Sequence, residues 1–236
     1  MNLKKNVAML AAVMCAVSIR SSAQSSSDLA AWEALVVTPI GAFAPQPFGS
    51  GTSLAVRYGR MSKGGATTSN FGAGVRLGPL GINAGITKPD CLSGETCGVY
   101  MAAVDLNLPI ISTAMGSGTL KIGLDPAAGY AKPRDSNIDA NFMSAAVSLP
   151  FELSFPLGSS ATLTPYLVPG FGYGRVSGSA STESVSSTES GTRTMFGGGL
   201  AIGTSMFQIS AGFQKVFLTD APTVIGVNLS IGGGHK

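Results

Sequence analysis

Apolar and polar residues alternate along most of the chain, most clearly in "FQISAGFQKVF" at 207–217. Phe207, Ile209 and Phe213 fall on one parity of this segment, whereas Ser210 falls on the other. Successive side chains of an extended chain point to opposite faces, so a period of two predicts a β-strand. Segments with this pattern recur along the chain, and none shows a helical period of comparable quality. The ten segments are 52–61, 69–77, 80–88, 98–110, 119–131, 141–155, 161–176, 193–204, 206–217 and 222–232.

The second face of these segments carries small residues where a soluble protein would carry charged ones. In "MFGGGLAIG" at 195–203 it presents Met195, Gly197, Ala201 and Gly203. A soluble sandwich needs Lys, Glu and Thr on its solvent face. Small residues suit the crowded interior of a narrow barrel, and the aliphatic face must then point outward, toward lipid. The pattern predicts an all-β fold, a closed antiparallel transmembrane up-and-down β-barrel of about ten strands.

The connections between the segments alternate in length. Those after the first, third, fifth and seventh segments are long and polar, as in "SKGGATTS" and "SGSASTESVSSTESG". Those after the second, sixth and eighth are tight: "GPL", "PLGSS" and "GTS". Long loops at one end and short turns at the other are typical of outer-membrane barrels, whose long loops face outward.

The stretch before the first strand leaves the strand number open. Residues 28–50 are apolar but contain prolines, and we assign 24–50 to a periplasmic or plug segment and 51–236 to the barrel. The stretch could instead supply extra strands, so eight or twelve strands are alternatives. Pro165 and Pro169 each remove a ladder donor from the seventh segment, so a bulge or bend is expected there.

The N-terminus has the pattern of a secretory signal peptide. Lys4 and Lys5 precede an apolar stretch at 7–19, and "SSA" at 21–23 offers small residues for cleavage. The stretch is too short to span a membrane as a helix. We therefore assign 1–23 to a signal peptide and expect export.

The composition is unusual for a soluble protein and fits a membrane barrel. Charged residues make up 11% of the chain, and Gly numbers 32, whereas soluble domains carry roughly 25% charged residues. The net charge of +3 is small and scattered. A nucleic-acid partner is therefore not indicated.

The cysteines point to one small disulfide. Cys91 and Cys97 lie close together in "KPDCLSGETCG", and an exported chain meets an oxidising compartment. We expect these two residues to be bonded, which labelling of free thiols would test. Cys15 raises the alternative of a lipoprotein, but "AVMC" lacks the Leu and the small residue of a lipobox.

The chain resembles the small bacterial outer-membrane β-barrel proteins, the class that includes the transmembrane domain of outer-membrane protein A. The resemblance rests on the signal peptide, "TPYLVPGFGYGRV" at 164–176, "MFGGGLAIG" at 195–203 and "TVIGVNLSIG" at 223–232. It implies insertion into the outer membrane by the barrel-assembly machinery. Members commonly end in an aromatic residue that this machinery recognises, whereas this chain ends in "GGGHK".

Catalytic chemistry is not indicated. Some barrels of this class are hydrolases, which rely on a His with a Ser or carboxylate for general-base work. The single histidine, His235, lies in a Gly-rich tail one residue from the end. No Cys or His cluster suggests a metal, and no motif suggests a cofactor. We therefore expect a protein that is not an enzyme.

Charged residues on the inner parity have two interpretations. They could line a polar pore and tune its selectivity, or they could form an internal network of paired charges. We favour the network because ten strands enclose a narrow interior. These candidate lumen charges are Arg57, Arg76, Asp105, Lys121, Asp125 and Glu152.

A basic residue recurs near the loop end of every second strand, on the outward parity and two positions after an apolar or aromatic residue. Such an arrangement places rings at the membrane interface and cations at headgroup height. We expect these residues to contact phosphates of outer-membrane lipid, in particular lipopolysaccharide; generic anchoring at a membrane edge is the alternative. The residues are Arg60, Lys88, Lys132, Arg175 and Lys215.

Three function classes remain open from the sequence. The first is a structural or surface-interaction barrel that works through its extracellular loops, and the second is a narrow porin-like channel for ions or small solutes. The third is a soluble secreted β-sandwich. No oligomeric state is indicated.

Overall fold

The structure is a computed structural model that describes residues 35, 37–47, 51–63, 66–89, 98–134, 139–179, 186–217 and 223–232. Within these ranges the one helix is α3 (Pro39–Ala42). No helix of the described part is long and apolar enough to cross a membrane. The fold is all-β, as the alternating pattern predicts.

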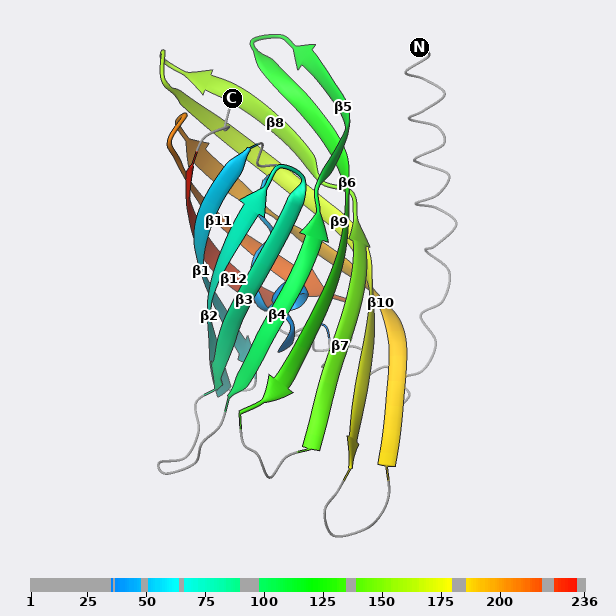
Figure 1. The fold of residues 1–236 in the computed structure, drawn as a ribbon. Helices are drawn as coiled ribbons and strands as arrows, with labels where there is room; N and C mark the ends of the chain where they lie inside the picture. Colours follow the sequence, from blue (N-terminus) through cyan, green and yellow to red (C-terminus); the bar gives the residue numbers. More distant parts are fainter. Residues whose placement is uncertain are drawn as a thin grey trace, which may run out of the picture.

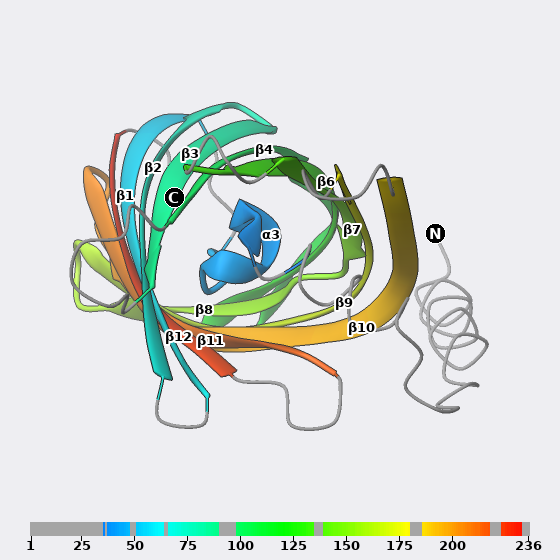
Figure 2. The same cartoon turned by 90° about the horizontal axis from the view of Figure 1, so that it is seen from below.

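Ten strands close into a ring in which every neighbouring pair is antiparallel (Figures 1 and 2). β1 pairs with β12, the last strand, and β9 pairs with β10. With these two pairings each of the ten strands has a neighbour on both sides. The prediction of a closed antiparallel barrel of about ten strands is confirmed. The strands are β1 (Thr52–Lys63), β2 (Ala66–Leu77), β3 (Leu80–Pro89), β4 (Val99–Leu106), β6 (Gly118–Pro133), β7 (Asp139–Ser148), β9 (Ala161–Ser179), β10 (Ser186–Gly203), β11 (Phe207–Val216) and β12 (Thr223–Gly232).

Two further strands continue members of the ring beyond short breaks. β5 (Leu108–Met115) follows β4 after Asn107, and β8 (Phe151–Leu157) follows β7 after Leu149 and Pro150. β5 pairs with the first half of β6, and β8 pairs with the first halves of β6 and β9. Each of the ten sequence segments is therefore one path along the wall, and two of these paths are interrupted.

The bulge expected at Pro165 and Pro169 is not in β9. The register of β9 with β10 runs unbroken past both prolines. The neighbouring strand is interrupted instead, because Leu149 and Pro150 separate β7 from β8 opposite Pro169. Pro150 and Pro169 each lack the N–H that a ladder bond needs, so regular pairing is interrupted here, although Leu149 N still donates to Pro169 O at 2.9 Å.

The barrel has a turn end and a loop end. At the turn end, Gly78, Gly116 and Gly158 hold φ values of +60°, +62° and +66°, a backbone conformation that favours glycine. The described chain also enters β1 at Thr52 and leaves β12 at Gly232 at this end.

The connections at the loop end lie largely outside the described residues. The long loops expected after the first and seventh segments are shorter than predicted, because β1 extends to Lys63 and β2 begins at Ala66, and because β9 extends to Ser179 and β10 begins at Ser186. Polar residues of these stretches pair across the two strands, so a polar composition alone does not mark a loop.

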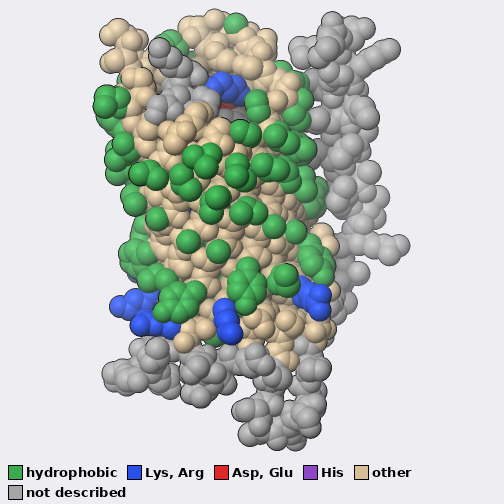
Figure 3. All heavy atoms as spheres, in the orientation of Figure 1, with side chains coloured by type: hydrophobic (Ala, Val, Ile, Leu, Met, Phe, Trp, Pro, Cys, Tyr) green, Lys and Arg blue, Asp and Glu red, His purple; other side chains and the backbone are tan. Residues whose placement is uncertain are grey.

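The outer face of the wall is apolar. Phe207, Ile209 and Phe213, which a soluble core would bury, are 43%, 49% and 37% exposed. Exposed aliphatic and aromatic side chains are spread over the wall between the two ends and form an apolar band on the face that Figure 3 shows. β1 (Thr52–Lys63) has 12 residues, enough for the roughly 9–11 residues that a tilted strand needs to span a bilayer.

The inner face surrounds a segment of the chain itself. α3 and the residues around it lie inside the ring of strands (Figure 2). Leu35 packs against Met195 and Val216 toward the loop end, and Pro47 lines a cavity toward the turn end. The described residues from 35 to 47, here called the lumen segment, thus run along the barrel axis from the loop half to the turn half.

Candidate functional site

Five strands on different sides of the barrel hold the lumen segment through hydrogen bonds. Thr38 Oγ1 and Ser144 Oγ of β7 lie 2.6 Å apart. Most of the remaining bonds run from wall side chains to backbone carbonyls of the segment, and Arg57 instead reaches a side-chain amide. They are Asn70 Nδ2 to Ala42 O at 2.7 Å, Gln214 Nε2 to Ile40 O at 2.7 Å, Tyr166 Oη to Pro45 O at 3.0 Å, and Arg57 Nη2 to Gln46 Oε1 at 2.8 Å.

These bonds satisfy backbone groups that the segment cannot pair internally, because α3 has only four residues. A buried carbonyl without a partner costs free energy comparable to a lost hydrogen bond. Asn70 and Gln214 are themselves buried, at 1% and 6% exposure. The amides of the wall therefore fix the position of the segment and are not solvent-exposed lumen residues.

Glycines of the wall make room for the segment. A Cβ at Gly72 would lie 2.6 Å from Cζ of Phe43, and one at Gly59 would overlap the carbonyl oxygen of Ala42. Gly172 likewise lies under Leu35, and a Cβ there would approach its side chain. The inner face is rich in glycine because these glycines leave the volume that Leu35, Ala42 and Phe43 occupy.

Most of the predicted lumen charges lie beside the segment. Arg57, Arg76, Asp105 and Asp125 line a cavity of about 90 Å³ between the segment and the wall. Arg76 Nη2 and Asp105 Oδ2 form an ion pair at 2.6 Å, and Asn83 Nδ2 donates to Asp105 Oδ1 at 2.8 Å. Two cations and two carboxylates therefore share this space.

The remaining two predicted lumen charges line a second cavity toward the turn end. This cavity has a volume of about 440 Å³, and Lys121 and Glu152 face it from paired positions of β6 and β8. Hydroxyl side chains supply most of the other polar lining, and Ser154 Oγ and Thr164 Oγ1 lie 3.0 Å apart. Glu152 is only 2% exposed.

The six lumen charges are three basic and three acidic side chains, four of them at the first cavity and two at the second. Arg76 and Asp105 form an ion pair, whereas Arg57 bonds to Gln46 and Asp125 Oδ1 is buried without a hydrogen-bond partner among the described residues. Charges that must leave water are tolerated when each has a partner of opposite sign. The ion pair of Arg76 with Asp105 is what the internal network, one of the two interpretations that the sequence leaves open, would require at these two residues. Within the described part of the chain, the two cavities share no lining residue.

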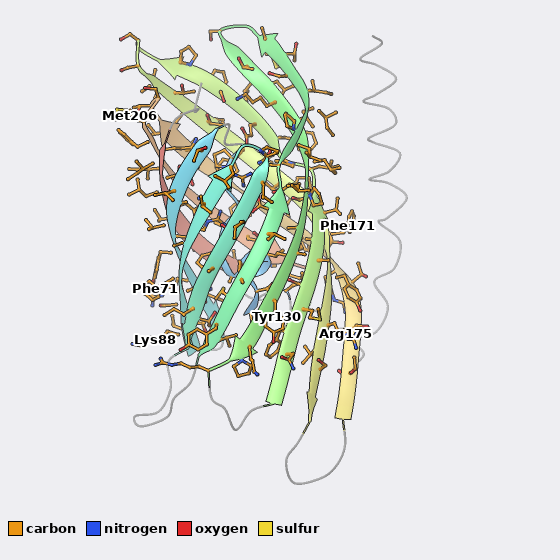
Figure 4. All side chains as sticks on the ribbon, in the orientation of Figure 1. Phe71, Lys88, Tyr130, Phe171, Arg175 and Met206 are labelled. Atoms are coloured by element: carbon orange, nitrogen blue, oxygen red, sulfur yellow. The ribbon has the colours of Figure 1, made fainter. Side chains whose placement is uncertain are left out.

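The five predicted rim cations lie at the loop end of the outer wall. Arg60, Lys88, Lys132 and Arg175 are exposed, and Lys215 is half-buried. Lys88 and Arg175 project from the wall near its loop end, whereas Met206 lies at the turn end (Figure 4). Basic side chains gather at the loop end below the apolar band (Figure 3).

Aromatic side chains lie just inside the rim cations. Tyr58 precedes Arg60 by two positions, and its ring centroid lies 5.3 Å from that of Phe71. Tyr130 precedes Lys132 in the same way, and its hydroxyl donates to Asn141 Oδ1 at 2.6 Å. Among the described residues no ion pair involves any of the five cations.

Several predictions fall on residues outside the described ranges. These are the disulfide between Cys91 and Cys97, the signal peptide at 1–23, and the tail that carries His235. Within the described part, no group of three His, Cys, Asp or Glu side chains could hold a metal ion.

Of the wall side chains that hold the lumen segment, Arg57 alone is among the residues singled out from the sequence. Asn70, Tyr166 and Gln214 lie on the same parity as the lumen glycines. Large polar side chains on a face of small residues are the signal that could have identified them, because such a face has room for them only where a partner exists.

Comparison with known proteins adds little to this description. No protein-family model and no curated protein sequence matches the chain. Similar solved structures include the attachment invasion locus protein Ail of Yersinia pestis, at 16% identity over 77% of this chain and 95% of that chain, with a TM-score of 0.33. Two others are the outer membrane enzyme PagL (13% identity, 75% and 98% covered, TM-score 0.37) and the N-terminal β-barrel domain of OprF from Pseudomonas aeruginosa (12%, 78% and 98%, 0.34).

These three proteins are bacterial outer-membrane β-barrels. The predicted resemblance to this class is confirmed for the fold, which the closed ring of ten strands in this chain establishes by itself.

Proposed function

We propose that this protein is an outer-membrane β-barrel with a structural or surface-interaction role that it performs through its loop end, without enzymatic activity. The observation that carries the proposal is the occupation of the lumen by residues 35 to 47. A barrel whose interior is filled by its own chain offers its outer wall, its rim and its loops to other molecules.

The membrane location follows from the outer wall. Exposed side chains such as Leu54, Ile225 and Ile231, at 67%, 65% and 60%, would cost free energy in water. A closed barrel has no free strand edge around its ring, so its backbone groups are satisfied within lipid. In this orientation the loop end faces outward and the turn end faces the periplasm.

The basic residues at the loop end of the outer wall indicate which molecules the barrel would contact. Arg60, Lys88, Lys132, Arg175 and Lys215 would contact phosphates of lipopolysaccharide and of other anionic lipid at the outer surface. Support comes from their position at one end only, below an apolar band, with aromatic side chains between band and cations. Insertion by the barrel-assembly machinery belongs to the same proposal.

A narrow porin-like channel is the second candidate. The charged lining around the lumen segment favours it, since Arg57, Asp105 and Asp125 would face a passage if the segment left the lumen. The wall bonds to Ala42, Ile40 and Pro45 argue against a segment that leaves readily.

Planar-bilayer recording of the purified full chain separates the two candidates. The proposed barrel gives no steady single-channel current, whereas the channel gives reproducible current steps at all voltages. Heat-modifiable gel mobility and extraction that requires detergent serve as the check that the recorded protein is a folded membrane barrel. A chain soluble without detergent would contradict both candidates.

A further inference from the structure

The outer wall carries a groove, of about 380 Å³, where the first and last strands of the barrel meet. Tyr58 and Arg60 of β1 form one side, and Thr223, Ile225 and Val227 of β12 form the other, with the backbone of Gly226 between them. Tyr58 pairs with Val227 and Arg60 with Ile225 in the register of the two strands. The groove therefore runs along the strand direction on the lipid-facing side of the wall.

The ring of Tyr58 leans away from the groove. It contacts the ring of Phe71 on β2 at 5.3 Å between centroids, and its hydroxyl lies 3.5 Å from Ser69 Oγ on the same strand. Ile225 and Val227, both branched at Cβ, cannot extend far enough to fill the space that the ring leaves. The groove is therefore open and lined mainly by apolar side chains.

Polar groups occupy only the loop end of the groove. Arg60 and Thr223 line it there, and the side chain of Lys215 projects from the paired position next to Thr223. Arg60 and Lys215 are two strands apart, so their backbones lie roughly 12 Å from each other. The apolar groove ends between two cations and a hydroxyl. It is therefore complementary to a lipid, whose acyl chain would lie in the apolar part and whose phosphates would meet the polar end.

We propose that this groove binds one acyl chain of lipopolysaccharide, with its phosphorylated headgroup held by Arg60, Thr223 and Lys215. This proposal rests on the proposed function, because the loop end must face the outer leaflet. Two separated cations fit a headgroup with two separated phosphates better than the single phosphate of a glycerophospholipid. The groove would then be a specific lipid site within a rim that otherwise contacts lipid generally.

The test measures binding of purified lipopolysaccharide by native mass spectrometry of the folded full chain in a neutral detergent. Arg60→Gln removes the guanidinium, and Val227→Trp fills the groove. Each variant should bind lipopolysaccharide about tenfold or more weakly, the effect expected for losing a charge-assisted hydrogen bond or a buried chain. Phosphatidylglycerol, as the second probe, should bind the wild-type chain more weakly than lipopolysaccharide.

Matched controls come from the far side of the barrel. Arg175→Gln removes a cation from the same rim, and Val147→Trp enlarges a side chain that is 48% exposed, close to the 46% of Val227. Val147→Trp should bind lipopolysaccharide as the wild-type chain does, and Arg175→Gln, which removes one general rim contact outside the groove, should weaken binding clearly less than Arg60→Gln does. If Arg175→Gln weakens lipopolysaccharide binding as much as Arg60→Gln does, the groove is not a specific site and the rim cations act alike. If phosphatidylglycerol binds as tightly as lipopolysaccharide, the proposed lipid is wrong.

Folding and the proposed function are checked separately from the groove. Heat-modifiable mobility shows whether each variant forms the barrel, and Ile225→Trp replaces Val227→Trp if the latter does not fold. Wild-type chain that fails to insert into bilayers would contradict the proposed function. Variants that insert and bind lipopolysaccharide unchanged would contradict the groove alone.

Discussion

The inner and outer faces of the barrel are built from alternate residues of the same strands. On the inner face, Gly72, Asn70 and Gln214 each meet a particular atom of the lumen segment. On the outer face, Ile202 and Ile209 lie opposite each other on β10 and β11, and 48% and 49% of their surfaces remain exposed. Lipid adapts to any apolar surface, whereas a neighbouring segment of chain does not.

This difference predicts where the protein tolerates change. The outer face needs apolar residues of any shape, because lipid fills the space beside them. The inner face needs particular residues, because a missing methylene leaves a cavity and an added one meets backbone. The following substitutions compare the two faces directly.

The largest expected difference is between two phenylalanines. Phe43→Ala removes a side chain that is 2% exposed inside the barrel, and it should lower the free energy of unfolding by about 3–5 kcal/mol. Phe207→Ala on the outer wall, where the side chain is 43% exposed, should cost only the transfer part, about 2 kcal/mol, because lipid fills the gap. Urea unfolding from lipid vesicles measures both, and equal losses would contradict an interior packed around Phe43.

Breaking the ion pair of the inner face should have the next largest effect. Asp105→Asn leaves Arg76, whose side chain is 12% exposed, beside a neutral group, and the free energy of unfolding should fall by about 3 kcal/mol. The double variant Arg76→Gln/Asp105→Asn should recover part of this loss, because neither charge is then unpaired. A double variant less stable than the single one would show that the pair does not act as a unit.

An arginine introduced on the outer face should respond to depth in the membrane. Ala211→Arg lies near the middle of β11 on the exposed parity and should cost about 2–4 kcal/mol. Thr188→Arg, exposed and near the loop end of β10, should cost at most about 1 kcal/mol because the side chain reaches the headgroups. Equal costs measured in lipid vesicles would contradict the orientation of the apolar face toward lipid.

The rim cations should matter least for stability. Replacing Arg60, Lys88, Lys132, Arg175 and Lys215 together by Gln should change the free energy of unfolding in neutral detergent by no more than about 1 kcal/mol. The amount of lipopolysaccharide that co-purifies with the protein should fall. Unchanged co-purification would reduce the rim to a general anchor.

The fold could be predicted from the sequence because the outer face obeys one rule. Alternation at positions such as Phe207, Ile209 and Phe213 identifies strands, and small residues on the other parity identify the inside. The breaks at Asn107 and at Leu149 with Pro150 could not be predicted. They depend on which strand lies opposite, and one chain position does not reveal its cross-strand neighbour.

The inner face was only partly predictable for the same reason. Charged residues such as Arg76 and Asp105 stand out on a face of small residues, and the structure brings these two together. The roles of Asn70 and Gln214 require knowledge of where Ala42 and Ile40 lie, residues 28 and 174 positions away in sequence. Contacts over such separations follow from the closed fold and not from local pattern.

The most direct test of the account is a disulfide between the lumen segment and the wall. Thr38→Cys and Ser144→Cys replace two hydroxyls whose oxygens lie 2.6 Å apart, a separation that places two sulfurs within bonding reach. In a chain that also carries Cys91→Ser and Cys97→Ser, we expect this pair to oxidise in the folded barrel and to lose its reactivity toward a thiol reagent. The control pair, Thr38→Cys with Ala145→Cys, should keep two free thiols, because the side chain of Ala145 is on the exposed parity of β7. Two free thiols in the first pair, as in the control pair, would contradict a lumen filled by this segment.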